Sequence, residues 1–485
     1  MKRAALITAD EGKTLEFKKD ISSPRNLLKT LVAFANTAGG RIVIGVEDKT
    51  RRPIGIDNPL DEEERLCNMI ADSISPRLVP SIELTTVDGK TLLLVEVFLS
   101  SSRPHYIVSE GPEAGVYVRL GSTNRQADRE LIAELHRSVE GVSFDELPMP
   151  HLTVDDLAMN SIKSSFEDIR EVDEKTLLTL RLLIKEQGRN VPTKGGILLY
   201  GRDRPAHFPD CWAQCGRFIG VDKTRIFDHI ELEGPLPSLV DSIMLFLKKH
   251  AMRGADFSEV RRKDVWSIPI EPLREAVVNA VVHADWSQRG APVRVAFFDD
   301  RIEIENPGIL PPGMTVEDMR AGVSKIRNPV IARVFRELKL IEQWGSGIPR
   351  IFRETAAGGF PEPYFIELGL RLRFVFPLTK PLKIDEEQPA PQSEERLESR
   401  LESRLESRLA AKIVLLIESQ EAGKAELARE LGHKSVSGEL HKQIRRLIAL
   451  DWIEMTVPEK PNSRLQKYRL TDEGKKALDI EKEQK

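Results

Sequence analysis

The sequence predicts an α+β protein built from several domains. Its 485 residues are enough for about three or four domains of typical size. Helical and strand-like hydrophobic patterns alternate as far as about residue 380, and an acidic, proline-containing stretch at 381–395 then separates them from a helical end region. The content of 40% hydrophobic and 31% charged residues is typical of a globular protein.

Charge and cysteine content limit the class of protein further. The formal net charge is −4, so any binding to nucleic acid has to come from local basic patches. Three cysteines (Cys67, Cys211 and Cys215) are too few for a disulfide framework and fit a reducing cytosol. No apolar run approaches the roughly 18 residues that span a bilayer. We therefore expect a cytoplasmic protein without membrane contact and without a signal peptide.

The first domain is placed at residues 1–140. A helix is expected from Ser23, a capping residue followed by Pro24, to the glycine pair at 39–40. The next segment, RIVIGVED at 41–48, is so apolar that it predicts a strand buried on both faces. Further strands are expected at 82–86, 91–98 and 116–120, with the DGK turn at 88–90 joining the first two.

The second domain is placed at residues 145–380. It contains a predicted helical subregion at 170–187 and a helical pattern at 271–286. Residues 291–308 predict a hairpin that turns at Asp299 and Asp300, and residues 370–378 predict a closing strand.

A linker is placed at residues 381–409, and it contains the tetrapeptide RLES three times between 396 and 407. On a helix this spacing gives a slowly winding leucine stripe, formed by Leu397, Leu401, Leu405 and Leu409. The pattern fits a solvated linker helix and an oligomerisation helix equally well, and the second option would make the protein a homo-oligomer.

The last domain is placed at residues 410–477. Three helices, a two-stranded wing and a final turn are expected in that order, which resembles a winged helix-turn-helix. The basic residues Lys442, Arg445 and Arg446 lie on its expected recognition helix, where they suit contacts with a nucleic-acid backbone.

The first domain resembles the Schlafen-type AlbA-like domain, because the elements LEFKKD, FANTAGG and IGVEDK follow one another in that order. The resemblance implies an acidic triad of Glu11, Glu16 and Asp48, which carries metal-dependent nuclease activity in some members. Carboxylates suit Mg²⁺ or Mn²⁺, and such an ion activates water for phosphodiester cleavage. In an extended segment Lys18 shares the face of Glu16, so Lys18 is the expected phosphate contact.

The second domain resembles GHKL-type ATPases of the Bergerat fold, an α/β sandwich. REAVVNAVVHADW matches the N box of that family, and the resemblance implies that Glu275 orients water and Asn279 holds Mg²⁺. The spacing of four residues puts both on one face of a helix. The resemblance also implies that Gly308, Gly345 and Gly347 let the backbone approach the phosphates of ATP.

One departure from the GHKL pattern concerns the base. Asn306 stands where the family has the aspartate that reads adenine, and the motif lacks a second glycine. A neutral amide can still hydrogen-bond adenine. ATP binding with weak or absent hydrolysis is therefore expected. Arg327, in the segment SKIRNP, is a hypothetical phosphate sensor.

These expectations combine into a nucleotide-regulated nucleic-acid effector. The leading prediction is a metal-dependent endoribonuclease that acts on tRNA-like RNA under the control of ATP binding, with phage defence as a hypothesis by analogy. The alternative is an ATP-responsive DNA-binding transcriptional regulator without nuclease activity.

Overall fold

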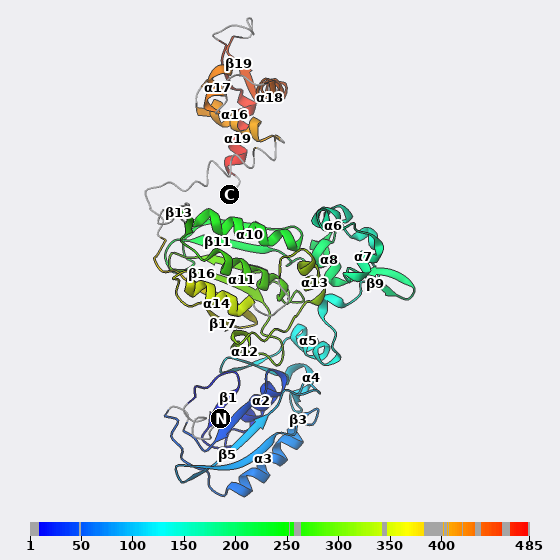
Figure 1. The fold of residues 1–485 in the computed structure, drawn as a ribbon, viewed down its shortest axis with the longest axis vertical. Helices are drawn as coiled ribbons and strands as arrows, with labels where there is room; N and C mark the ends of the chain where they lie inside the picture. The colour runs from blue at the N-terminus through cyan, green and yellow to red at the C-terminus, as the bar shows by residue number, and fades with distance from the viewer. Residues whose placement is uncertain are drawn as a thin grey trace. The chain divides into compact units, whose positions relative to one another are not determined.

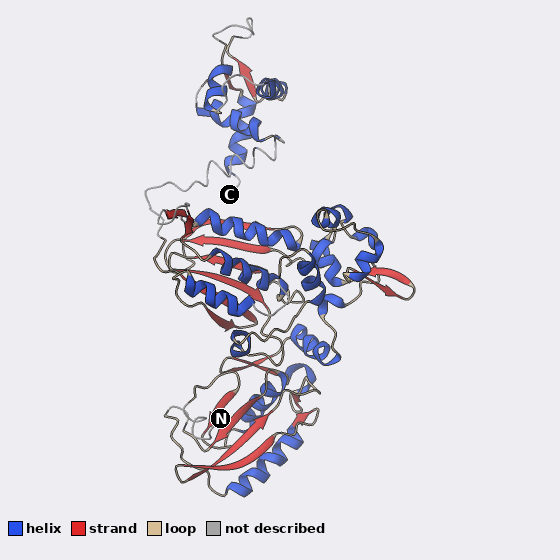
Figure 2. Ribbon diagram, viewed as in Figure 1, coloured by secondary structure: helices blue, strands red, loops and turns tan. Residues whose placement is uncertain are grey.

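The computed structural model describes residues 9–47, 50–251, 253–256, 263–341, 347–382, 401, 405, 407–419, 421–431, 438–457 and 466–483 (Figure 1). The chain divides into two compact units, Met1–Ile384 and Asp385–Lys485. Within the first unit we call residues 9–140 the N-terminal region and residues 141–382 the central region. Helices and strands are mixed throughout the first unit, which makes the protein an α+β protein (Figure 2).

The N-terminal region is built on a four-stranded sheet in the order β1-β2-β5-β4. Strands β1 and β2 are parallel, and the other neighbours are antiparallel. Two helices cover one face of this sheet, since their leucine and isoleucine side chains share a core with β2 and β5. The elements are β1 (Leu15–Lys18), α2 (Pro24–Asn36), β2 (Gly40–Ile44), α3 (Pro59–Ser73), β4 (Ser81–Val87) and β5 (Lys90–Val97).

The remainder of this region folds beside helix α2. The hairpin of β7 and β8 packs against α2, and helix α5 leads out toward the central region. The elements are β3 (Ile74–Ser75), β6 (Tyr106–Ile107), α4 (Gly111–Ala114), β7 (Tyr117–Leu120), β8 (Thr123–Gln126) and α5 (Arg129–Glu140).

Sequence patterns predicted α2 and the strands β2, β4, β5 and β7, whereas the helices α3 and α5 were not predicted. Pro24 occupies the first turn of α2, as expected, and the strand β2 is buried on both faces through Ile42, Val43 and Ile44. Ser23 does stand at the N-cap, but its side chain makes no capping hydrogen bond. The prediction of a serine cap was therefore wrong in its chemistry although the helix begins where expected.

The central region is organised around a six-stranded sheet in the order β12-β11-β15-β16-β18-β17. Only β11 and β15 pair in parallel. Helices α10, α11 and α14 cover one face, and their apolar side chains form the largest core of the protein (Figure 1). The elements are β11 (Ala213–Phe218), β12 (Ile226–Leu232), α10 (Leu236–His250), β13 (Arg253–Asp256), β14 (Lys263–Trp266), α11 (Ile270–Val282), β15 (Val293–Phe297), β16 (Arg301–Pro307), α12 (Val316–Arg320), α13 (Pro329–Glu337), α14 (Gly347–Ala357), β17 (Tyr364–Leu368) and β18 (Arg371–Pro377).

The helical subregion expected at 170–187 was only partly right. A helix covers Glu174–Thr179, but the chain then forms a hairpin that turns at Gln187 and Gly188, both with positive φ. The leucine-rich spacing before the turn concealed this strand. The elements between residues 141 and 207 are the short 3-10 helices Phe144–Glu146 and Val154–Asp156, α6 (Met159–Phe166), α7 (Glu174–Thr179), β9 (Leu183–Glu186), β10 (Arg189–Pro192), α8 (Lys194–Tyr200) and α9 (Arg204–His207).

In the second unit, the described residues form three helices, a two-stranded antiparallel sheet and a last helix. The expected final turn is in fact a helix of 12 residues. Leu401 and Leu405 of the RLES repeat are buried in this unit's own core, together with side chains of α16 and α18. The elements are α16 (Arg408–Ser419), α17 (Lys424–Glu430), α18 (Gly438–Ala449), β19 (Ile453–Met455), β20 (Tyr468–Leu470) and α19 (Asp472–Glu483).

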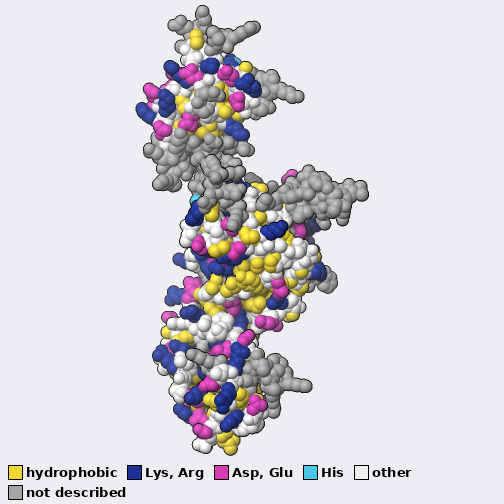
Figure 3. All heavy atoms as spheres, turned by 90° about the vertical axis from the view of Figure 1, so that its left-hand side faces the viewer, with side chains coloured by type: hydrophobic (Ala, Val, Ile, Leu, Met, Phe, Trp, Pro, Cys, Tyr) yellow, Lys and Arg dark blue, Asp and Glu magenta, His cyan; other side chains and the backbone are white. Residues whose placement is uncertain are grey.

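The surface carries charges of both signs. On the face shown in Figure 3, Lys and Arg side chains are interspersed with Asp and Glu side chains among the described residues. Of the described helices, none has the length and apolar character needed to cross a membrane.

Candidate nucleotide and nucleic-acid sites

The predicted nucleotide-binding residues of the central region converge on one cavity. The cavity has a volume of about 170 Å³ and lies between helices α11 and α14 and strand β16. More of its wall is apolar than polar, and charged and amide side chains lie among the apolar ones, a composition that suits a small molecule with polar groups. Its lining includes Glu275, Asn279, Asn306, Gly308 and Gly347. Gly345, the remaining predicted residue, lies outside the described residues.

Glu275 and Asn279 are joined on one face of α11. The side-chain Nδ2 of Asn279 donates to Glu275 Oε1 at 3.2 Å, which leaves Asn279 Oδ1 as the oxygen available to a cation. The second oxygen of Glu275 accepts from Arg350 Nη2 at 2.6 Å. Arg350, which also lines the cavity, was not singled out from the sequence. Its position in the first turn of α14, three residues after Gly347, was the available signal.

Asn306, at the position expected to read the base, is held by a hydrogen bond, and the nearby Gly308 is closely packed. Asn306 is buried at the end of β16, and its Nδ2 donates to Pro307 O at 3.1 Å. Gly308 has φ +100°, and a Cβ there would lie 2.8 Å from Cβ of Asp285. A side chain at position 308 is therefore excluded by both conformation and space.

Arg327 does not have the surroundings expected of a phosphate sensor. It forms an ion pair with Glu134 of α5 and donates to Ile309 O. Its neighbours Ser324, Lys325 and Ile326 are the part of that segment that lines the cavity. Arg327 therefore joins the central region to the helix that leads from the N-terminal region.

His283 lies beside the cavity and ends helix α11. Burial, together with the positive charge of Arg327, lowers the pKa of His283 to about 4. The imidazole is therefore neutral at physiological pH, which agrees with a packing role rather than that of a base.

In the N-terminal region, Glu16 lies on β1 and faces the helix-covered side of the sheet. Its two carboxylate oxygens are paired with Lys18 and Arg119. Lys18 shares the face of Glu16, as its position two residues along a strand predicts. Arg119, on β7, is buried and also donates to Gly12 O at 3.1 Å and Asn124 Oδ1 at 3.0 Å. Arg119 was missed because the strand pattern around it is otherwise apolar.

The described part of the acidic triad does not by itself form a metal site. Glu11 Oε1 accepts from Phe17 N at 2.7 Å, which brings Glu11 to the strand that carries Glu16. Asp48 lies outside the described residues. Among the residues that are described, no group of three or more His, Cys, Asp or Glu side chains is arranged to hold a metal ion. A metal ion at Glu16 would share the carboxylate with Lys18 and Arg119, whose positive charges oppose its binding.

Hydrogen bonds connect the cavity wall to the acidic region. Pro311 and Met314 line the cavity, and between them Gly313 N donates to Thr37 O at 2.6 Å. Thr37 Oγ1 in turn accepts from the backbone N of Arg119 at 2.8 Å. A second link is the ion pair of Lys13 with Glu367, at 2.5 Å and almost entirely buried.

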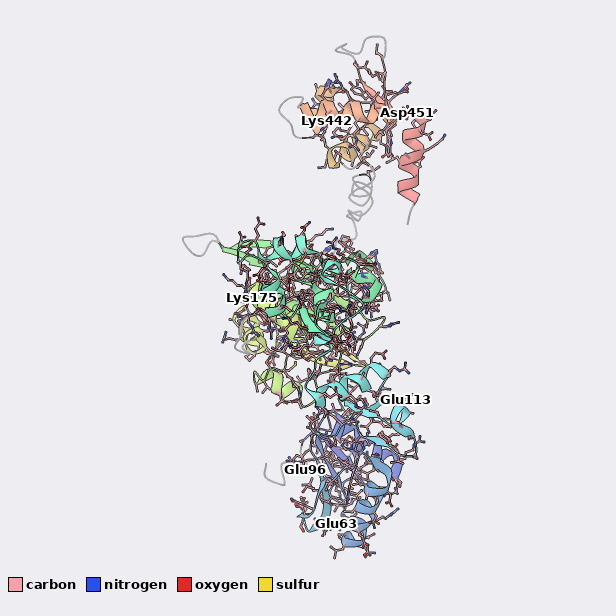
Figure 4. All side chains as sticks on the ribbon, turned by 90° about the vertical axis from the view of Figure 1, so that its right-hand side faces the viewer. Glu63, Glu96, Glu113, Lys175, Lys442 and Asp451 are labelled. Atoms are coloured by element: carbon pink, nitrogen blue, oxygen red, sulfur yellow. The ribbon has the colours of Figure 1, made fainter. Side chains whose placement is uncertain are left out.

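The basic residues predicted to contact nucleic acid in the second unit lie on α18. Lys442, labelled in Figure 4, and Arg445 are exposed, and Arg446 is half-buried. Gln443 and Ile444, which lie between them, are buried against the unit's core. The helix therefore has one packed face and one basic face.

Family models match three separate segments. Residues 11–128 match the family described as "Schlafen, AlbA_2". Residues 290–376 match "Putative ATP-dependent DNA helicase recG C-terminal", a HATPase model. Residues 410–471 match "Filamentation induced by cAMP protein Fic-like, C-terminal domain", so the winged-helix assignment made from the sequence is not the one that this comparison returns.

Two solved structures were also found among the matches. The DIP2311 protein from Corynebacterium diphtheriae is 20% identical with a TM-score of 0.43, and the match covers 98% of this chain and 97% of that chain. The N-terminal domain of a RecG-related protein from Nitrosomonas europaea is 30% identical with a TM-score of 0.22, over 26% of this chain and 89% of that chain. No curated protein matched. On the strength of the family models, the chain combines a Schlafen-type AlbA_2 domain with a HATPase domain of the RecG C-terminal type.

Proposed function

We propose that the protein is a nucleic-acid effector whose AlbA_2 domain is controlled by ATP bound in the cavity of the HATPase domain. The observation that supports this proposal is the loop at 309–314. It lines the cavity through Pro311 and Met314, and through Gly313 it holds Thr37, the hydrogen-bond partner of Arg119. A ligand that moves this loop would therefore act on the surroundings of Glu16.

For the acidic region we propose metal-dependent cleavage of RNA with a tRNA-like fold. Glu11, Glu16 and Asp48 would hold Mg²⁺ or Mn²⁺, which would supply an activated water, and Lys18 would contact phosphate. The approach of Glu11 to β1 supports the proposal, since it brings two of the three carboxylates to one strand. Defence against phage is the cellular role that we propose for such cleavage.

The test is cleavage of labelled tRNA by the purified chain with Mn²⁺, with and without ATP. We expect Glu11→Gln and Asp48→Asn to lower the rate by about a hundredfold or more, because each removes a ligand charge. Asp20→Asn is the matched control, since Asp20 is an exposed acid just after β1. Equal rates for wild type and Glu11→Gln, or cleavage without a divalent cation, would contradict the nuclease proposal.

The second candidate is a DNA-binding regulator without nuclease activity. The pairing of both Glu16 oxygens with Lys18 and Arg119 favours it, because a carboxylate held by two cations is a poor metal ligand. In this case α18 would bind duplex DNA through its basic face.

DNA binding can be tested by titration at several salt concentrations. Lys442→Gln and Arg445→Gln should each weaken binding and reduce the slope of log K against log salt by about 1. Lys476→Gln, on the exposed side of α19, should leave the slope unchanged. Tight duplex binding together with absent tRNA cleavage would select the regulator.

A further inference from the structure

Arg350 and Glu275 form an ion pair within the wall of the cavity. Arg350 Nη2 lies 2.6 Å from Glu275 Oε2, while Asn279 holds the other carboxylate oxygen. The Arg350 side chain is 26% exposed, whereas the Glu275 side chain is 11% exposed. The pair is therefore accessible from the cavity on its cationic side, next to the residue expected to hold Mg²⁺.

An arginine in this position can exchange one anionic partner for another. Guanidinium groups bind carboxylate and phosphate with the same forked geometry, and a phosphate carries more charge and more acceptor oxygens. Two other cations line the cavity, Lys325 and Arg336. Lys325 already donates to Pro312 O at 2.8 Å. Arg350 is the one that contacts the N-box residue Glu275.

We propose that Arg350 is the residue that distinguishes a nucleoside triphosphate from a diphosphate. In the free protein Glu275 holds it, and on binding of a triphosphate it moves to the terminal phosphate and releases Glu275. A diphosphate lacks this group and leaves the ion pair in place. The inference rests on the proposed nucleotide function of the cavity and goes beyond it by naming the residue that reads the ligand.

The proposal predicts that substitutions of Arg350 and of Glu275 change the affinity for a triphosphate in opposite directions. Removing the Arg350 charge should weaken binding of a triphosphate and leave a diphosphate almost unaffected. Removing the Glu275 charge should strengthen binding of a triphosphate, because the carboxylate no longer competes for the guanidinium. Substitution of a residue with a merely structural role would change the affinity for both ligands in the same direction.

The experiment measures dissociation constants of ADP and of a non-hydrolysable ATP analogue by calorimetry, so that turnover does not contribute. For Arg350→Gln we expect affinity for the analogue to fall about tenfold to a hundredfold, with ADP within about twofold. Glu275→Gln should raise affinity for the analogue by roughly threefold or more. Arg350→Lys keeps the charge but not the fork, so it should restore part of the preference.

Arg353→Gln is the matched control, because Arg353 is exposed on the same helix and makes the same change of charge. Wild-type affinities for this variant support the proposal. An equal loss for ADP and the analogue in Arg350→Gln, or an unchanged ratio of the two constants, would overturn it while leaving the nucleotide function standing. A wild-type chain that binds neither nucleotide would overturn the proposed nucleotide function and this inference with it.

Discussion

Among the described ion pairs of glutamate with arginine, two that lie in the candidate sites have different surroundings. Glu16 is paired with Arg119 in the N-terminal region, and Glu275 is paired with Arg350 in the central region. The Arg119 side chain is 1% exposed and the Arg350 side chain is 26% exposed. Arg119 also bonds Gly12 and Asn124, and its guanidinium lies over the ring of Phe34. The same chemical pair is thus enclosed in one domain and open to a cavity in the other.

This difference in exposure predicts that the Glu16–Arg119 pair has a structural role, whereas Arg350 can exchange Glu275 for a ligand anion. A buried pair has no solvent or ligand to replace a lost partner, so removing one member leaves an uncompensated charge. A pair at the edge of a cavity can be resolvated or can accept another ion at small cost. Breaking each pair in turn therefore tests whether exposure decides their roles.

The largest effect is expected from Arg119→Met. It leaves Glu16 with only its partly exposed partner Lys18, and we expect a loss of about 3–5 kcal/mol in the stability of the AlbA_2 domain. Hydrogen exchange of the β1 and β7 amides measures this value for the domain itself. Arg350→Met is the comparison: Glu275 is as buried as Glu16, but it lines the cavity, so water can reach its freed oxygen and we expect a smaller loss of about 1–3 kcal/mol. Similar losses for the two variants would break the distinction between the pairs.

A smaller effect is expected at the cavity, from His283. Its pKa is lowered to about 4 by burial and Arg327, whereas an unfolded chain has a pKa near the usual value. Between these two values the unfolded state binds more protons, so this contribution to stability is full above about pH 6.5 and decreases as pH falls toward 4.

The measurement for this prediction is urea unfolding at pH 7.5 and pH 5, followed by intrinsic tryptophan fluorescence, to which the buried Trp286 contributes. Between pH 7.5 and pH 5 the free energy of unfolding of the wild type should fall by about 1–2 kcal/mol more than that of His283→Asn. Parallel pH profiles for the two proteins would show that the imidazole is not sequestered beside the cavity.

The smallest effect is expected for Lys18→Gln, the second partner of Glu16. Its side chain is partly exposed, so water can replace it, and the expected loss is below about 1 kcal/mol. The same hydrogen-exchange measurement applies, which places Lys18→Gln and Arg119→Met on one scale. A loss as large as that of Arg119→Met would mean that the Glu16 pair depends on total charge and not on enclosure.

Much of the architecture could be predicted from local patterns. The helix that begins with Pro24 and the hairpin around Asp299 and Asp300 were present where expected, and the strand expected at 41–48 was found in shorter form at Gly40–Ile44. Glu275 and Asn279 could be paired in advance because four residues form about one helical turn. The cavity itself brings together residues from α11, β16 and α14, and the family resemblance supplied that convergence.

The arginines were missed for a physical reason. A pattern of apolar residues shows which positions are buried, but it does not show which distant charge compensates a buried charge. Arg119 lies within the apolar strand sequence VYVRL, and its partner is 103 residues away. Arg350 is 75 residues from Glu275. Such pairs depend on tertiary packing, so spacing along the chain does not reveal the partner, although the position of Arg350 three residues after Gly347 was a signal that it lies near the cavity.

The burial of Leu401 and Leu405 has a consequence for dissecting the protein. The Fic-like match begins at residue 410, which makes that position a tempting start for an isolated C-terminal fragment. Both leucines pack into the same core as Ile413 and Leu440. A fragment that starts at residue 410 would therefore expose the hydrophobic surface that the two leucines cover. The RLES repeats thus set where this part of the chain can be severed cleanly: upstream of Leu401, not at the match boundary.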